Sequence, residues 1–323
     1  MRFKAQKMRN IKVKEILYLL EKSDIVIGNT EHYFNNVPPS EHVNEESLDW
    51  INPIKKNKLE YLLNSKARII ICDKSINNPQ ELQSTKCLII VENPKLTFLR
   101  IASTFFLPKV EWGIHPTATV NSAANISDRC YIGPYSYIGK STIGDETIIY
   151  GHCHIYDQVT IGSHVIIHAG TVIGADGFGY QRNENGAFEK FPHIGGIIIK
   201  DNVEIGANTS IDRGALGNTI IEEGVKIDNL VHIAHNVRVG KHTAIIANTM
   251  ICGSTSIGEY SWIAPSVCIR DQLVIGNKVK VGMGSVVTKN IPNGETWLGV
   301  PAKPIAVFRE HQKIETKFNR SNF

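Results

Sequence analysis

The chain has 323 residues, enough to bury one large core or two smaller ones. Its 35 basic and 31 acidic residues are interspersed and leave a net charge of +4, so the composition does not call for nucleic acid as a partner. No apolar run approaches the roughly 20 residues that span a bilayer, and the basic N-terminus lacks the apolar core and cleavage site of a secretory signal. We therefore expect a cytoplasmic protein without membrane insertion.

Residues 1–110 predict a small α/β domain. The apolar residues of IKVKEILYLLEK (11–22) have helical spacing, whereas ARIIICD (67–73) and KCLIIVEN (86–93) are typical of buried strands. PKLTFLRIASTFF (94–106) predicts a second helix. The following PKVEWGIHP carries the chain into a repetitive region.

From Ile114 onward an aliphatic residue recurs every six positions, without a break over the twelve positions from Ile221 to Val287. Glycine often follows the aliphatic residue, as in IGSHVI and IGANTS. This is the hexapeptide repeat of a parallel β-helix, in which three units, about 18 residues, complete one coil. We predict a mainly β fold, a left-handed parallel β-helix domain over residues 111–296, with a C-terminal closing segment and short tail at 297–323.

Two segments interrupt the period, ADGFGYQRNENGAFEKFPHIGG (175–196) and RGALGNTI (213–220). Loops that leave a rigid scaffold often carry binding residues. We expect Asp176, Phe178 and Tyr180 to line a substrate groove; the alternative is that the loop only caps a coil.

Residues 18 apart should stack in a column, and two histidines fall in different columns. His235 shares its column with Gly253 and Asp271, so we expect it to face outward beside a glycine whose backbone N–H could donate to an oxyanion. The column of His232 holds Met250 and Cys268, a packing environment that favours a structural role.

Three segments, GADGFGY (174–180), IDRGALGNTII (211–221) and IDNLVHIAHNV (227–237), resemble the UDP-3-O-acylglucosamine N-acyltransferase family of lipid A biosynthesis. ENPKLTFLRIA resembles the last helix of that family's N-terminal domain. The resemblance implies that residues 1–110 bind the nucleotide and that residues 111–296 form the acyltransferase domain. The resemblance implies that His235 is the general base, Gly253 the oxyanion donor and Asp228 the residue that orients the imidazole. It also implies a homotrimer with active sites between subunits. An imidazole, with an ordinary pKa near 6.5, suits proton removal from an attacking amine, and no metal is required.

The chain departs from the family pattern in three places. SVCIRDQLVIG (266–276) lacks the second histidine, and we assign acyl-donor binding there to Asp271 and Gln272. In SLDWINPIKKNK, Trp50 and Asn52 match the base-stacking pattern but a lysine falls near its tyrosine, which leaves uracil and thymine open. The alternative for Trp50 is a packing role. The short tail after GVPAKPIAVF favours free coenzyme A as the acyl carrier.

Our leading prediction is transfer of a short acyl or hydroxyacyl group from acyl-coenzyme A to the amine of a UDP- or dTDP-linked amino sugar for a surface polysaccharide, with no bound cofactor. The alternative is the N-acyltransferase of lipid A biosynthesis itself, with acyl carrier protein as donor. A zinc-dependent carbonic anhydrase also uses this fold, but neither His232 with His235 nor His152 with His154 has a clear third ligand. A non-catalytic scaffold is the remaining alternative.

Overall fold

The computed structural model describes residues 9–76 and 85–310. The chain forms two compact units, Met1–Val110 and Glu111–Phe323. Most of the predicted tail, from residue 311 onward, lies outside the described residues. Within the described ranges, no helix is long and apolar enough to cross a membrane.

The N-terminal unit is built around a four-stranded sheet with the order β2-β6-β5-β4. Strands β4, β5 and β6 are parallel, and β2 runs antiparallel to β6. The predicted strands and the second helix are confirmed, since every residue of β5 and β6 is buried and α3 covers the whole predicted segment. The elements are β1 (Ile11–Lys12), α1 (Val13–Ile16), β2 (Ile25–Ile27), β3 (Tyr33–Phe34), β4 (Leu48–Trp50), α2 (Lys58–Asn64), β5 (Ile69–Cys72), β6 (Cys87–Ile90) and α3 (Pro94–Phe106), with 3-10 turns at Leu17–Leu19 and Ser40–His42.

The helix predicted over residues 11–22 forms only in part, over residues 13–19. Ile11 and Lys12 pair with Phe34 and Tyr33 as strand β1, and only the short α1 and a 3-10 turn follow. The pairing buries Ile11 against the core of this unit, so tertiary contacts override the local helical spacing.

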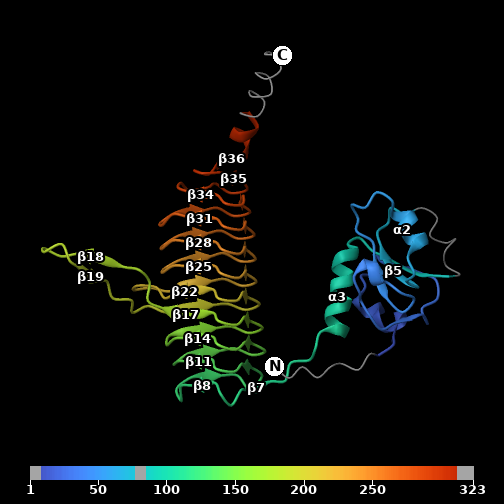
Figure 1. Ribbon diagram of the computed structural model, residues 1–323, viewed down its shortest axis with the longest axis horizontal. Coiled ribbons are helices and arrows are strands. Elements are labelled where there is room, and N and C mark those ends of the chain that lie inside the picture. The colour runs from blue at the N-terminus through green and yellow to red at the C-terminus, as the bar shows by residue number, and fades with distance from the viewer. Residues whose placement is uncertain (1–8, 77–84, 311–323) are drawn as a thin grey trace, which may run out of the picture. The chain divides into compact units, whose positions relative to one another are not determined.

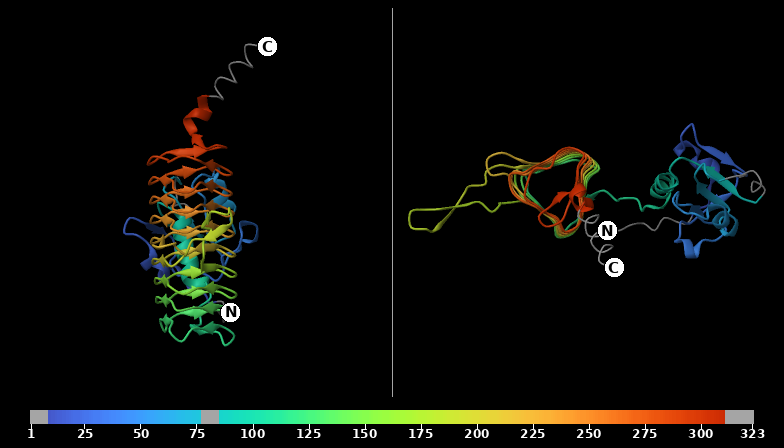
Figure 2. Two further views of the ribbon diagram at one scale, coloured as in Figure 1. Left: turned by 90° about the vertical axis from the view of Figure 1, so that its left-hand side faces the viewer. Right: turned by 90° about the horizontal axis from the view of Figure 1, so that it is seen from above.

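The C-terminal unit is a stack of coils with a triangular outline, seen end-on in Figure 2. Each coil contributes one short strand to each of three parallel sheets. The first sheet contains β7 (Gly113–Ile114), β10 (Tyr131–Ile132), β13 (Ile148–Ile149), β16 (Ile166–Ile167), β21 (Glu204–Ile205), β24 (Lys226–Ile227), β27 (Ala244–Ile245), β30 (Trp262–Ile263), β33 (Lys280–Val281), β35 (Thr296–Leu298) and the antiparallel β36 (Lys303–Pro304).

The other two sheets follow the same pattern. The second contains β8 (Thr119–Val120), β11 (Tyr137–Ile138), β14 (His154–Ile155), β17 (Val172–Ala175), β22 (Ser210–Asp212), β25 (His232–Ile233), β28 (Met250–Ile251), β31 (Cys268–Ile269) and β34 (Val286–Val287). The third contains β9 (Asn125–Ile126), β12 (Thr142–Ile143), β15 (Val159–Ile161), β20 (Ile197–Ile199), β23 (Thr219–Ile221), β26 (Arg238–Val239), β29 (Ser256–Ile257) and β32 (Val274–Ile275). The predicted hexapeptide β-helix is thereby confirmed.

The repeated aliphatic residue of each unit points into the prism. Ile233, Ile251 and Ile269 pair in register and are completely buried, and from Ile132 onward the corresponding residues of the other two columns are buried as well. The corners that follow most strands place a residue in the left-handed region, as at Asn236 (φ 61°) and Asn248 (φ 60°). Asparagine tolerates this conformation better than most residues, because its side chain can bond locally.

Both predicted interruptions leave the stack of coils. Between β17 and β20 the chain forms an antiparallel hairpin, β18 (Tyr180–Arg182) and β19 (Phe188–Lys190), which projects from the β-helix (Figure 1). The sequence predicts the loop but not these strands. After each interruption the register resumes, with Thr160 opposite Ile198 and Ile198 opposite Ile220. The coils on either side therefore remain stacked.

Adjacent isoleucines of one strand allow a matched test of this core. Ile149 is fully buried in the prism, whereas Ile148, its neighbour in β13, points outward and is only partly buried. We expect Ile149→Ala to lower the free energy of unfolding by about 2–5 kcal/mol because it leaves a cavity. Ile148→Ala is the control, with an expected loss below about 1 kcal/mol. Urea unfolding followed by circular dichroism measures both, and equal losses would contradict the inward assignment.

Candidate active site

His235 lies directly against Gly253 of the next coil. The pairing of Ile233 with Ile251 sets the two residues opposite each other, as the 18-residue column predicts. A Cβ atom built on Gly253 would lie 2.7 Å from both Cε1 and Nε2 of His235. The imidazole therefore extends across the Gly253 backbone, and any larger residue there would displace the ring. In the described part of the chain, no acceptor takes the Gly253 N–H.

The imidazole of His235 is oriented by Asn236. The Nδ1 atom of His235 lies 3.1 Å from Asn236 Oδ1, and the same oxygen accepts a hydrogen bond from the Ala215 N–H at 3.0 Å. Because an amide oxygen only accepts, His235 Nδ1 carries the proton and Nε2 is left with a lone pair. The nitrogen beside Gly253 is therefore the one able to take up a proton.

Asp228, predicted to orient His235, has other partners within its own chain. Its carboxylate accepts hydrogen bonds from the N–H groups of Asn229 at 2.7 Å and Ala247 at 3.2 Å. These contacts join two successive coils at a corner, seven residues before His235. Within one chain Asn236, and not Asp228, bonds the imidazole of His235, and an orienting role for Asp228 stays a prediction.

His232 lies in a polar cluster, although its register partners are Met250 and, one coil further, Cys268. Its Nδ1 is 2.8 Å from Ser210 Oγ and its Nε2 is 3.7 Å from Asp212 Oδ2. Burial raises the pKa of Asp212 to about 6, against the opposing effect of His232. The predicted column with Met250 and Cys268 is confirmed, but the strand on the other side of β25 supplies Ser210 and Asp212, so the surroundings of His232 are more polar than expected. A structural role for His232 stays a prediction.

The 175–196 loop contacts His235 through residues that the sequence did not single out. A Cβ on Gly177 would lie 2.8 Å from both Cβ and Cδ2 of His235 and 3.0 Å from Nε2 of His193. The rings of His193 and His235 meet edge to face, with centroids 5.4 Å apart and an angle of 75°. The alternation of glycines in DGFGY was the available signal, since Gly177 and Gly179 both face His193.

The three loop residues predicted to line a groove have different surroundings. Asp176 accepts a hydrogen bond from Lys190 Nζ at 2.5 Å, which lowers its pKa, and lies 3.7 Å from Arg213 Nε. Phe178 is 85% exposed and packs against Tyr180, with ring centroids 4.9 Å apart. These contacts leave Phe178 and Tyr180 on the projecting hairpin, and substrate binding by the three residues stays a prediction.

Asp271 and Gln272 are exposed, one coil beyond Gly253. Gln272 donates its backbone N–H to the Gly253 carbonyl at 2.9 Å and its side-chain amide to Asp271 Oδ2 at 3.2 Å. The column His235, Gly253, Asp271 therefore exists as predicted, and an acyl-donor role for Asp271 and Gln272 stays a prediction.

Trp50 and Asn52 line a hollow of about 480 Å³ in the N-terminal unit. Trp50 also packs against Phe98 of α3, with ring centroids 6.0 Å apart, so it combines the packing role with an accessible face. Asn52 Oδ1 accepts the Ile54 N–H and shapes the turn after β4. The hollow is also lined by Val37, Pro38, Pro39, Ser40, Leu48, Asp49, Ile51, Lys55, Tyr61 and Phe98.

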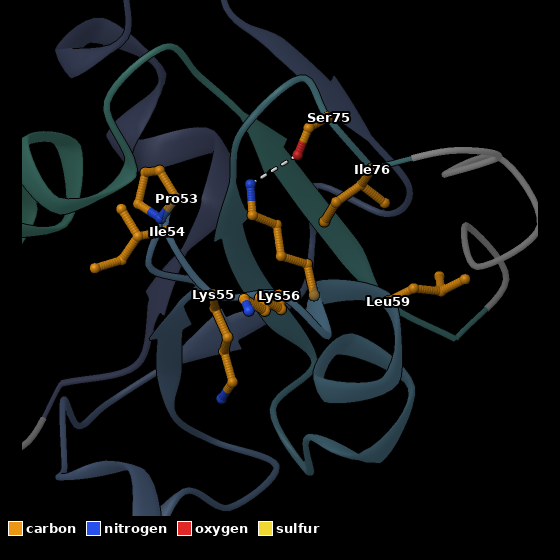
Figure 3. Close-up of a pocket in the computed structure, with 8 residues that line it drawn as sticks. Pro53, Ile54, Lys55, Lys56, Leu59, Ser75 and Ile76 are labelled. Carbon is orange, nitrogen blue, oxygen red and sulfur yellow. Dashed lines mark hydrogen bonds between the residues drawn. The ribbon is translucent and has the colours of Figure 1, made fainter. Parts of the chain in front are cut away.

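A second hollow of about 380 Å³ is lined by residues of the turn after β4, of α2 and of the segment after β5, among them Pro53, Leu59 and Ser75 (Figure 3). Lys55 lines both hollows. Lys58 also lines the second one and bonds Asp73 at 2.5 Å and Ser75 Oγ at 2.8 Å. The carboxylate of Asp73 thus balances the charge of Lys58. Across residues 9–76 and 85–310, no group of three or more His, Cys, Asp or Glu side chains is arranged to hold a metal ion.

Known proteins are similar to this chain both in the hexapeptide repeat and over most of its length. The family model for bacterial transferase hexapeptide (six repeats) matches residues 140–175. A UDP-3-O-acylglucosamine N-acyltransferase of Bordetella pertussis is 36% identical over 295 residues, 84% of this chain and 80% of its own. One of the same name from Methylobacterium nodulans is 49% identical over 151 residues, 46% of this chain and 43% of its own.

A solved UDP-N-acetylglucosamine acyltransferase from Campylobacter jejuni shares the fold, with a TM-score of 0.54 and 21% identity over 59% of this chain and 73% of its own. The identity to the Bordetella protein extends far beyond the matched repeat, over most of both chains. With the fold and sequence in agreement, the chain is an acyltransferase and belongs to the UDP-3-O-acylglucosamine N-acyltransferase family.

Proposed function

We propose that this chain transfers a hydroxyacyl group from acyl carrier protein to the amino group of UDP-3-O-acylglucosamine, with His235 as the general base. The relatives carry that name at 36% identity over 84% of this chain, which favours the alternative over our leading prediction of acyl-coenzyme A and a dTDP- or other UDP-linked amino sugar. The observation that carries the proposal is the free Nε2 of His235 held against Gly253.

The reaction forms a C–N bond and breaks the C–S bond of the thioester. As the amine attacks the carbonyl carbon, its excess proton passes to Nε2 of His235, and the thiolate that leaves takes up a proton in turn. Asn236 supports this direction of transfer because it fixes the proton of the free imidazole on Nδ1. The base is therefore prepared before the substrate binds.

The carbonyl oxygen becomes negatively charged in the tetrahedral intermediate, and we assign its stabilisation to the N–H of Gly253. Its N–H belongs to the same residue against which His235 packs. A backbone donor needs no reorganisation when the charge develops, which is the basis of oxyanion stabilisation. Base and oxyanion donor thus act on the two ends of one reacting centre.

The N-terminal hollow is our proposed site for the base of the nucleotide. Trp50 offers an aromatic face to a planar base, and Asn52 offers an amide to its polar edge. We also propose a cytoplasmic homotrimer. Large apolar side chains on the outer faces of the β-helix, such as Met250 (49% exposed) and Trp262 (51% exposed), support packing of identical chains.

Replacing the base tests the proposal directly. We expect His235→Ala to lower kcat for acyl transfer by at least about 10²-fold, because the amine proton loses its acceptor. His164→Ala is the matched control, a histidine on another coil whose side chain is 53% exposed and pairs with Glu146. Steady-state kinetics measure both variants. A wild-type rate for His235→Ala would overturn the assignment.

The acyl carrier decides between the two sequence-based hypotheses. With UDP-3-O-acylglucosamine as acceptor, we expect hydroxyacyl-acyl carrier protein to give a kcat/KM at least about 10²-fold above that of the same acyl group on coenzyme A, because remote contacts to a protein donor contribute binding energy in the transition state. Mass spectrometry of the product quantifies both. A preference for a short acyl-coenzyme A and a dTDP-linked amino sugar would restore the leading sequence prediction instead.

A further inference from the structure

His193 is a buried imidazole that the proposed mechanism leaves unused. It is only 7% exposed and lies where the 175–196 loop returns to the coils, between β19 and β20. Its ring meets that of His235 edge to face at 5.4 Å between centroids. A titratable side chain in this position is in direct contact with the proposed base.

The hydrogen bonds of His193 determine its tautomer. Its Nδ1 lies 2.9 Å from the carbonyl oxygen of Phe191, and a carbonyl only accepts, so Nδ1 carries the proton. Nε2 then bears a lone pair. That atom is buried and has no hydrogen-bond partner among the described residues. An unpartnered buried acceptor is rare in a folded protein and destabilises it, which is a reason to look for a function.

Gly177 brings the two histidines together. A Cβ at this residue would be 3.0 Å from Nε2 of His193 and 2.8 Å from Cδ2 of His235, so both rings approach the same bare backbone. A Cβ on Gly253 would lie 2.7 Å from Cε1 and Nε2 of the same ring. The ring of His235 therefore packs against the backbone of two glycines, and His193 meets it edge to face.

We propose that His193 is a positioning residue for His235: it holds the general base against Gly253 and places an acceptor nitrogen beside the ring that becomes positively charged. The inference rests on the proposed function. Because the lone pair of His193 favours the protonated form of His235, its removal should make that form less stable.

The remaining titratable groups on the elements packed around this pair stay the same in variants of His193. Asp176 is paired with Lys190 and Arg213, and Asp212 with His232, so their charges are largely balanced. A change of pH dependence in such variants therefore reports on His193. The titratable groups around the two histidines are Asp176, Lys190, Arg213, Asp212, His232 and, one coil beyond Gly253, Asp271.

Two substitutions of His193 test its acceptor nitrogen and its aromatic ring separately. His193→Phe keeps an aromatic ring but removes the lone pair, and we expect kcat to fall on the order of 10- to 100-fold with KM for the UDP-sugar within about twofold. The acid limb of the kcat/KM profile should move to lower pH, because protonated His235 loses stabilisation. His193→Gln, whose amide can donate to Phe191 and still present an acceptor, should recover most of kcat and the wild-type profile.

The outcomes distinguish this inference from the proposed function. Activity of the wild type together with loss of activity in His235→Ala, but unchanged kcat and pH profile in His193→Phe, would overturn the role of His193 alone. Equal impairment of both His193 variants with an unshifted profile would indicate a purely structural role and also overturn it. No turnover of the wild type with acyl carrier protein and UDP-3-O-acylglucosamine would reject the proposed function.

A measurement without substrate tests the inference even if the wild type shows no turnover, and its wild-type arm does not depend on how well a variant folds. Histidine-selective ¹⁵N NMR of the wild-type protein should show His193 protonated on Nδ1 and unprotonated on Nε2 at neutral pH. In His193→Phe, the titration midpoint of His235 should move to lower pH. Protonation of His193 on Nε2, or an unmoved His235 midpoint in a folded variant, would contradict the inference.

Discussion

One aliphatic side chain in every six residues is buried in the prism of the β-helix, and this burial fixes the register of each coil on the next. Ile233, Ile251 and Ile269 stack without exposure, so the residues two places further on must stack as well. Full burial of such a side chain is worth about 1.5–3 kcal/mol, and a slip by one residue would expose an entire column. The contact of His235 with Gly253 is thus a consequence of core packing.

The same register lets the chain leave the stack without disturbing it. The strands before and after each insertion pair in register, so the entropic cost of the insertion is limited to closing its own loop. Both insertions serve the candidate site. The first brings Gly177 and His193 to the ring of His235, and the second brings the Ala215 N–H to Asn236. Rigid coils supply the base, and the loops supply its surroundings.

The periodic part of the molecule could be predicted from sequence because each coil repeats a local rule. That rule placed His235 next to Gly253. It could not place His193, since a loop that contains a hairpin has no period to count along. Nor could it give the partner of Asp228, because the nearest backbone N–H groups compete for a carboxylate at a corner. In the N-terminal unit, the pairing of Ile11 with Phe34 likewise overrides the local helical pattern.

The partners of His235 also determine where charge resides during the proposed reaction. Asn236 is neutral, and His193, protonated on Nδ1 and bonded to a carbonyl, is neutral in the same tautomer. Neither supplies the full negative charge that an aspartate would give to an imidazolium. In the proposed reaction, the positive charge on His235 and the oxyanion assigned to Gly253 develop on two atoms of one reacting centre. Proton transfer and oxyanion formation are therefore coupled, because each charge lowers the energy of the other.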